Sequence, residues 1–314
     1  SEGTAPMQAL GEGPGGELSS MTAIALLIAA NIASNAPDRR ADAHLYDIQL
    51  DILRRGFAPE GLTIEPVRWM DPNVDWTRFG AVLVNCSWDY QDRHEDFLDT
   101  LDRIAALGVP VFNSPATVRW NIRKTYLREF EAKGVPIIPT LWPERPVAED
   151  IRDAMAAFGV DDVIIKRQVG GGARGQTRYT HANMPTGGSI LDRPGMIQPF
   201  IPSIATEGEY SFLFVDGEFS HALVKRAAQG DYRIQEAYGG KSQTIDASTK
   251  DQRQARGVLD VLADKPLYAR VDMVRGADGT LLLMELEVIE PYLYPKDGPQ
   301  IGAMLGKALR RRIG

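Results

Sequence analysis

The feature of this sequence that most limits its fold is a regular alternation of apolar and amphipathic segments between Thr22 and about Trp120. The apolar segments have the length of buried strands, and the amphipathic ones carry apolar residues at helical spacing. In chain order they are residues 22–30, 41–56, 81–88, 94–108 and 109–113. Strands that alternate with helices form parallel sheets, so we predict a doubly wound, Rossmann-like α/β domain over residues 21–119.

One loop of this domain is a candidate substrate loop. Ligands of parallel sheets bind at the carboxyl ends of the strands, and "SWDYQD", residues 87–92, leaves such an end. We therefore expect Ser87, Asp89 and Tyr90 to contact a substrate. A plain strand-to-helix connection, with Asp89 or Asp92 as a cap, explains the same residues equally well.

After a predicted helix over residues 121–134, the pattern changes to hairpins. The dipeptide Asp216-Gly217 is a strong two-residue turn signal, and "RGADG", residues 275–279, separates two further apolar runs. The predicted strands cover residues 161–169, 175–180, 209–215, 218–226, 267–274 and 280–288. This part of the chain should therefore be a mostly antiparallel sheet with helices.

Composition excludes several classes of protein. The net charge of −7 over 314 residues argues against a nucleic-acid binder, which needs a basic surface. The single cysteine, Cys86, excludes an intrachain disulfide, fits a cytoplasmic location and is expected to be buried packing. Residues 1–20 contain no Lys or Arg and are expected to be a disordered tail or a cloning remnant. The apolar segment that follows is too short to span a bilayer, so we expect no membrane association.

Two carboxylates interrupt the apolar stretch "LLLMELEVIEP", residues 281–291. By strand alternation, Glu285 and Glu287 should point to one face, in line with Leu281 and Leu283, while Glu290 should lie on the other face. Two like charges on a half-buried face cost several kcal/mol per ion unless they are compensated.

A third carboxylate offers an explanation for this pair. Asp272 lies in "RVD" on the preceding strand of the same hairpin, so three acids should converge. Oxygen ligands of this kind select a hard cation such as Mg²⁺. The alternative is a salt-bridge cluster with Arg270, Lys225 and Arg226.

The glycine-rich segment "GGGARG", residues 170–175, matches a dinucleotide fingerprint in letters only, because the following residues do not form a helix. A loop between two strands, whose backbone amides lie over phosphates, fits better. A merely flexible loop is the alternative. Lys166 lies on the strand immediately before this loop and is expected to bind phosphate rather than to extend its ammonium into solvent. The segment "GGKS", residues 239–242, is no Walker loop, because Gln235 stands where a glycine is required.

The ordered set of strand lysine, glycine loop, "MIQPFI", "RVD" and "ELE" resembles the ATP-grasp ligases, and bacterial glutathione synthetases in particular. The segment "QGDYRIQEAYGGKS", residues 229–242, resembles their substrate loop. The resemblance covers about Asn113 to Tyr292. It implies an ATP-grasp fold with a small lid subdomain over residues 120–196 and a C-terminal subdomain over residues 197–314.

The resemblance also implies roles for individual residues. ATP would be bound by Lys124, Lys166, Gly171, Gly172, Ala173, Arg174 and Gly175, by the hinge residues Gln198, Phe200 and Ile201, and by Glu209. Lys225, Arg233 and Arg270 would neutralise the transferred phosphoryl group. Asp272, Glu285 and Glu287 would hold Mg²⁺, with two ions expected. Arg233, Gln235, Gly239 and Gly240 would contact the substrate. The sequence has Glu287 and Gln235 where the family usually has asparagine.

The activity that follows is an ATP- and Mg²⁺-dependent ligase. It would activate a small amino-acid-like carboxylate as an acyl phosphate for attack by nitrogen. With "NCSWDY" and "GDYRIQEAYGG", the whole chain resembles the D-cycloserine-forming ligases of antibiotic biosynthesis, which implies cyclisation of O-ureido-D-serine. An intermolecular ligase of the dipeptide or glutathione type, and a non-catalytic ATP-binding regulatory protein, are the alternatives. The sequence also leaves a homodimer open.

Overall fold

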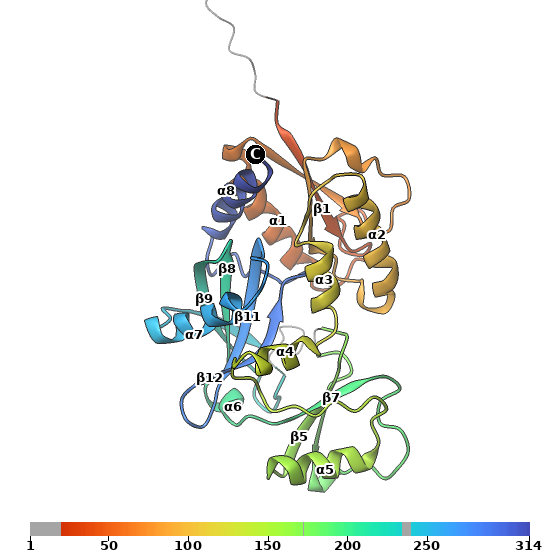
Figure 1. Cartoon of the computed structure of the whole chain (residues 1–314), viewed down its shortest axis with the longest axis vertical. Coiled ribbons are helices and arrows are strands. Elements are labelled where there is room, and N and C mark those ends of the chain that lie inside the picture. The colour runs from red at the N-terminus through yellow and green to blue at the C-terminus, as the bar shows by residue number, and fades with distance from the viewer. Residues whose placement is uncertain (1–19, 172, 234–239) are drawn as a thin grey trace, which may run out of the picture.

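The computed structural model describes residues 20–171, 173–233 and 240–314. The N-terminal region is a four-stranded parallel sheet in the order β2-β1-β3-β4, and Figure 1 shows it with α1 and α2. Its elements are β1 (Thr22–Ile28), α1 (Ala43–Phe57), β2 (Leu62–Arg68), β3 (Ala81–Cys86), α2 (His94–Ala106) and β4 (Val111–Phe112). The predicted parallel sheet is confirmed, and Cys86 is fully buried in its core.

Two short helices lead out of this sheet, α3 (Pro115–Asn121) and α4 (Tyr126–Ala132). The prediction of one helix over residues 121–134 is therefore wrong at its start. The backbone N–H of Lys124 donates to the carbonyl of Gln168 at 2.8 Å, which ties the intervening turn to the next subdomain. A continuous helix would direct that N–H to its own preceding turn instead.

The middle of the chain forms a three-stranded antiparallel sheet in the order β6-β5-β7, covered by α5. Figure 1 shows this unit apart from the N-terminal sheet, at the opposite end of the molecule. Its elements are α5 (Ala148–Phe158), β5 (Asp162–Arg167), β6 (Thr177–Thr180) and β7 (Gly195–Pro199). The glycine loop connects β5 to β6, as predicted.

The largest sheet is antiparallel, in the order β10-β9-β8-β11-β12. Its strands are β8 (Glu209–Val215), β9 (Glu218–Arg226), β10 (Lys241–Ile245), β11 (Tyr268–Arg275) and β12 (Leu281–Glu287). The helices of this region are α6 (Ser203–Thr206), α7 (Thr249–Asp260) and α8 (Ile301–Ile313). Single 3-10 turns lie at η1 (Ala58–Glu60), η2 (Trp76–Arg78), η3 (Gln91–Arg93) and η4 (His181–Asn183).

Helix α8 joins the end of the chain to the N-terminal sheet. It packs against α1 at two glycines, where a Cβ on Gly56 would lie 2.0 Å from the backbone of Gly302. The Arg310 guanidinium donates to the carbonyl of Glu60 at 2.9 Å. In the part of the chain that is described, no helix is long and apolar enough to cross a membrane.

The pairing of β11 with β12 contains a bulge that overturns one prediction. Asp272 pairs with Glu285, but the next residue, Met273, pairs with Leu283, so Met284 has no partner of its own. Leu281 and Leu283 therefore lie in the core together with Leu286 and Val288. Glu285 and Glu287 are not in line with Leu281 and Leu283, because the extra residue reverses the alternation between them.

Candidate active site

A cavity of about 800 Å³ lies where the three sheets meet, and most of the predicted site residues line it. These are Asp89, Lys124, Lys166, Gly171, Ala173, Arg174, Glu209, Lys225, Arg233, Arg270, Asp272, Glu285 and Glu287. The other described candidates do not line it, and they are Ser87, Tyr90, Gly175, Gln198, Phe200, Ile201 and Gly240. Gly172, Gln235 and Gly239 lie outside the described residues.

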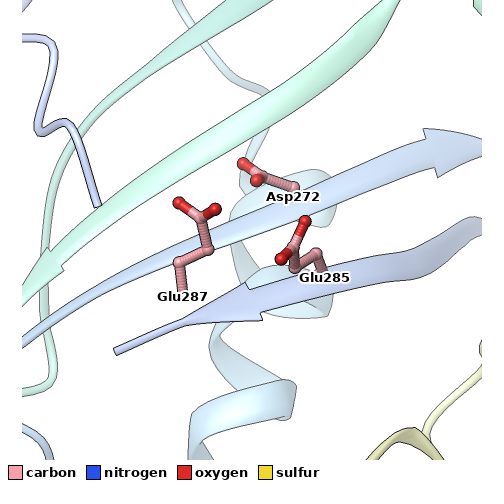
Figure 2. Close-up of side chains that lie close together, drawn as sticks. All are labelled: Asp272, Glu285 and Glu287. Carbon is pink, nitrogen blue, oxygen red and sulfur yellow. The ribbon is translucent and has the colours of Figure 1, made fainter. Parts of the chain in front are cut away.

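Three carboxylates converge in this cavity, as Figure 2 shows. Asp272 projects from β11, and Glu285 and Glu287 project from β12 toward the same spot. One oxygen from each side chain lies within 4.8 Å of the others. An all-oxygen donor set of this size fits Mg²⁺, which binds carboxylates together with phosphate oxygens.

Basic side chains balance these acids. The Arg270 guanidinium lies 3.0 Å from Asp272 Oδ2 and 2.5 Å from Glu287 Oε2. Lys225 Nζ lies 3.7 Å from Asp272 Oδ1, and Lys124 contacts Glu285. The salt-bridge alternative is thus present in the same cluster, without one of its proposed members. Arg226 is exposed and hydrogen-bonds Gln243 at 3.2 Å instead.

The surroundings give the acids different proton affinities. Burial raises the pKa of Glu287 to about 7 against the attraction of Arg270, and the charge of Glu285 contributes to this increase. Asp272 is also buried, but Arg270 and Lys225 overcome that effect and lower its pKa to about 2. Burial likewise raises the pKa of Glu209 to about 7, although Lys225 Nζ lies 2.9 Å away.

Lys166 differs from the other cavity lysines in having no acid beside it. Lys124 and Lys225 each contact a carboxylate, whereas Lys166 makes no hydrogen bond or ion pair with the described residues. Burial lowers the pKa of Lys166 against the attraction of Glu285, and the charge of Lys124 adds to the lowering. A half-buried ammonium that contacts no carboxylate suits an anionic ligand.

The glycine loop reaches the N-terminal region. Arg174 Nη1 lies 2.9 Å from Asp92 Oδ2 on η3. Ala173 adopts a positive φ of 59°, which an alanine rarely does. Gly175 has a positive φ of 73°, a backbone conformation that favours glycine. The loop thus covers one side of the cavity.

Sequence reasoning missed the apolar wall beside the lysines. The side chains that form it are those of Ile164, Met196, Ile204 and Met284. Their signal was present, because Ile164 and Met196 precede Lys166 and Gln198 by two residues and so share a face with them. Gln198 itself is buried and donates from Nε2 to Thr140 Oγ1 at 3.1 Å.

The predicted substrate loop uses its own polar groups to hold its shape. Asp89 accepts from the Ala30 amide at 3.0 Å and from Trp69 Nε1 at 2.6 Å, so both of its oxygens have protein donors. The Ser87 hydroxyl is fully buried and donates to the Val84 carbonyl at 2.8 Å. Tyr90 is buried against Phe97, with ring centroids 5.1 Å apart. Other residues of the same loop, Trp88, Gln91 and Asp92, also line the cavity.

Glu290 is not turned away from the site, as alternation predicted. It lies beyond the end of β12, where the chain no longer alternates, and it lines the cavity. Its Oε2 is buried and has no hydrogen-bond partner among the described residues. Burial and the charges of Glu287 and Glu285 raise the pKa of Glu290 well above its ordinary value.

Comparisons with known proteins show the family of this chain. Residues 24–113 match the family model of the D-cycloserine synthetase DcsG N-terminal domain, and residues 145–292 match that of the prokaryotic glutathione synthetase ATP-grasp domain. The cycloserine biosynthesis protein DcsG of Streptomyces lavendulae is 32% identical over 262 residues, which cover 76% of this chain and 86% of that protein. A glutathione synthetase of Prochlorococcus marinus strain MIT 9313 is 30% identical over 59% of this chain and 58% of its own length.

Solved structures give the same result. The crystal structure of D-cycloserine synthetase DcsG has a TM-score of 0.78 at 27% identity and covers 93% of this chain and 100% of its own. A D-alanine–D-alanine ligase from Bacillus anthracis, complexed with ATP, shares the fold with a TM-score of 0.65 at 16% identity and covers 93% and 100%. The predicted fold and family are confirmed: the chain belongs to the ATP-grasp ligases, enzymes that form carbon–nitrogen bonds with ATP and Mg²⁺.

Proposed function

We propose that this ligase phosphorylates the carboxylate of a small amino-acid-like substrate and that a nitrogen atom of the substrate then displaces the phosphate. The convergence of Asp272, Glu285 and Glu287 beside Arg270 and Lys225 carries the proposal. Such a site has no nucleophile of its own to activate. It acts by holding reactants together and by neutralising charge on the transferred group.

The cations of the cavity are assigned to two parts of the reaction. Lys166 is without a carboxylate and is assigned to ATP phosphates together with Lys124. Arg270 and Lys225, with Arg233, are assigned to the transferred phosphoryl group. Mg²⁺ at the three carboxylates would supply the positive charge that Lys124 and Arg270 provide now, which leaves these two side chains available to the phosphates.

Further roles remain proposals at the level of single residues. Phe200 and Ile201 follow β7. The Phe200 N–H donates to the backbone carbonyl of Asp162 at 3.0 Å, so the hinge is fixed to β5. We assign the adenine to this hinge, with Gln198, and the ribose to Glu209. The glycine loop, residues 170–175, is assigned to the phosphates. Two Mg²⁺ ions, a homodimer and a cytoplasmic location likewise remain predictions.

For the substrate, we propose O-ureido-D-serine, cyclised to D-cycloserine. The support is the 32% identity to the cycloserine biosynthesis protein DcsG over 86% of that protein. The N-terminal sheet adds to this support, since residues 24–113 match the family model of the DcsG N-terminal domain.

An intermolecular carboxylate–amine ligase is the second candidate, because residues 145–292 match a glutathione synthetase domain. Phosphate release separates the two. With Mg²⁺–ATP, O-ureido-D-serine alone should release phosphate and yield D-cycloserine by mass spectrometry, whereas γ-glutamylcysteine with glycine should not. Release only with the two-substrate mixture would favour the second candidate. ATP binding without release for any carboxylate would favour the regulatory alternative.

A further inference from the structure

The side chain of Glu290 stands at the junction between the N-terminal sheet and the large antiparallel sheet. Its backbone carbonyl accepts from Trp88 Nε1 at 3.1 Å, and the carbonyl of Pro291 accepts from Asn85 Nδ2 at 3.0 Å. Tyr90 Oη lies 3.5 Å from Glu290 Oε1. Donors from one other segment, residues 85–88, therefore fix the backbone at this junction.

One oxygen of this carboxyl group has nothing to bind within the chain. Glu290 Oε2 is buried and without a hydrogen-bond partner in the described residues, yet the residue lines the cavity. A buried acceptor without a donor costs about 1–3 kcal/mol. A site that keeps such an acceptor on a rigid backbone is arranged for a donor that arrives from outside.

Three of the cations that share the cavity are paired with other acids. Arg40 lies 2.5 Å from Asp42, Lys225 lies 2.9 Å from Glu209, and Lys124 contacts Glu285. Glu290 is also not a member of the carboxylate cluster whose oxygens lie within 4.8 Å of one another. Glu290 therefore forms no ion pair with these three side chains and does not belong to the proposed Mg²⁺ ligands.

The chemistry of the surrounding wall limits the ligand group further. Trp88 and Tyr292 also line the cavity, with ring centroids 6.5 Å apart, and the Arg40 guanidinium lies 5.6 Å from the Trp88 centroid, because aromatic rings attract cations. An acid beside aromatic rings suits a protonated amine that donates hydrogen bonds.

We propose that Glu290 binds the protonated amino group of the substrate and so selects amino acids over carboxylates that lack this group. The proposal rests on the proposed ligase function, because it places the carboxylate to be activated beside Arg270 and the amino group beside Glu290. Glu290 is then a specificity-determining residue, and it takes no part in nucleotide binding.

The test compares two enzymes with two substrates. O-ureido-D-serine is compared with 3-(ureidooxy)propanoate, which lacks only the amino group, in wild type and in Glu290→Gln. The wild type should prefer O-ureido-D-serine by about 10²-fold in kcat/KM, since removing one partner of a buried charged pair has effects of this size. Glu290→Gln should lose that preference through KM, and its rate with the amine-free analogue should stay within about 3-fold of wild type.

A matched control variant removes one negative charge at a position outside the cavity. Glu218→Gln, on the exposed start of β9, should behave as wild type with both substrates. The Kd of Mg²⁺–ATP, measured by calorimetry, should be unchanged in Glu290→Gln. A preference that survives in Glu290→Gln, an equal loss with both substrates, or no preference in the wild type overturns the proposal.

A binding measurement separates this proposal from the proposed function. D-serine and 3-hydroxypropanoate, which lacks only the amino group, are titrated in the presence of Mg²⁺ and a non-hydrolysable ATP analogue, with tryptophan fluorescence as the readout. Binding of D-serine alone, lost in Glu290→Gln, supports the role of Glu290 even if O-ureido-D-serine is not turned over. Turnover of O-ureido-D-serine without any amine-dependent binding or rate overturns the role of Glu290 and leaves the ligase function standing.

Discussion

Replacing Glu287 by glutamine tests whether this acid is present for Mg²⁺–ATP or for the stability of the protein. Glutamine keeps the shape of the side chain and removes its charge. In the structure Glu287 lies 2.5 Å from Arg270, and Arg270 also contacts Asp272 at 3.0 Å and the Tyr292 carbonyl at 3.0 Å. Arg270 therefore keeps two partners when Glu287 loses its charge.

The size of the effect follows from the pKa of Glu287. Burial, with the charge of Glu285, raises this pKa from 4.5 to about 7, and that value already includes the attraction of Arg270. The folded protein thus holds this proton more tightly than the unfolded chain, so stability falls as the pH rises from about 4.5 to about 7. The difference between the two pKa values corresponds to at most about 3 kcal/mol.

Thermal melts without nucleotide at pH 5 and pH 8 measure this effect. At pH 5 Glu287 is protonated in the folded wild type, so Glu287→Gln should melt at the same temperature. At pH 8 the variant should melt higher, by about 4 °C for a chain of this length. Its gain in melting temperature with Mg²⁺–ATP should shrink, and turnover should fall by about 10²-fold, because a metal ligand has been removed.

The opposite pattern would refute this reasoning. If Glu287 serves mainly to pair with Arg270, the variant without nucleotide melts several degrees lower at pH 8 and its Kd for Mg²⁺–ATP is unchanged. Glu218→Gln is the control for the removal of one negative charge, because Glu218 is exposed and does not line the cavity. It should change neither the melting temperature nor its dependence on pH.

Three further predictions concern the nucleotide site and the junction of the sheets. Lys166→Ala should weaken ATP binding at least about 10-fold by calorimetry. The nucleotide-free melt should be unchanged or higher, since the variant removes a partly desolvated ammonium that contacts no carboxylate, and a lower melt would contradict this. Amide exchange at residues 173–176 should slow when Mg²⁺–ATP is added, and equal rates would argue against a covering loop. Gly56→Ala should lower the free energy of unfolding in denaturant by at least about 1–3 kcal/mol, because the new Cβ meets the Gly302 backbone. The control Gly257→Ala, with open space around it, should be neutral or stabilising, and equal effects of the two variants would contradict the close packing of α1 on α8.

The parts of the fold that could be predicted from the sequence are those with one clear period. The central N-terminal strands β1 and β3 are almost entirely apolar because both faces are covered, and the hairpins carry turn residues such as Asp216-Gly217. The edge strands β2 and β10 were not located. Four of the five residues of β10 are exposed, and β2 contains Pro66, so neither shows the apolar run of a central strand.

The candidate site was predictable as a set of residue types and less so as a geometry. The three acids and the basic residues around them were found because charges in apolar strands are rare and costly. Glu290 was misplaced because alternation holds only inside a strand, and β12 ends at Glu287. The role of the substrate loop stays a prediction: Asp89 lines the cavity but also accepts from an amide and an indole of its own domain, which no sequence pattern reveals.

The bulge at Met284 shows how a conflict in the sequence can predict structure. Regular alternation would put Glu285 and Glu287 on the same face as Leu281 and Leu283, so that either the leucines leave the core or the carboxylates enter it. Burying two carboxylates costs several kcal/mol per ion, whereas one extra residue in a strand costs only local pairing. The strand therefore shifts its register between Leu283 and Glu285, and both requirements are met. Two charges that fall in phase with two core leucines within one strand thus indicate a bulge between them, and deleting Met284 should drive both glutamates toward the core and abolish folding.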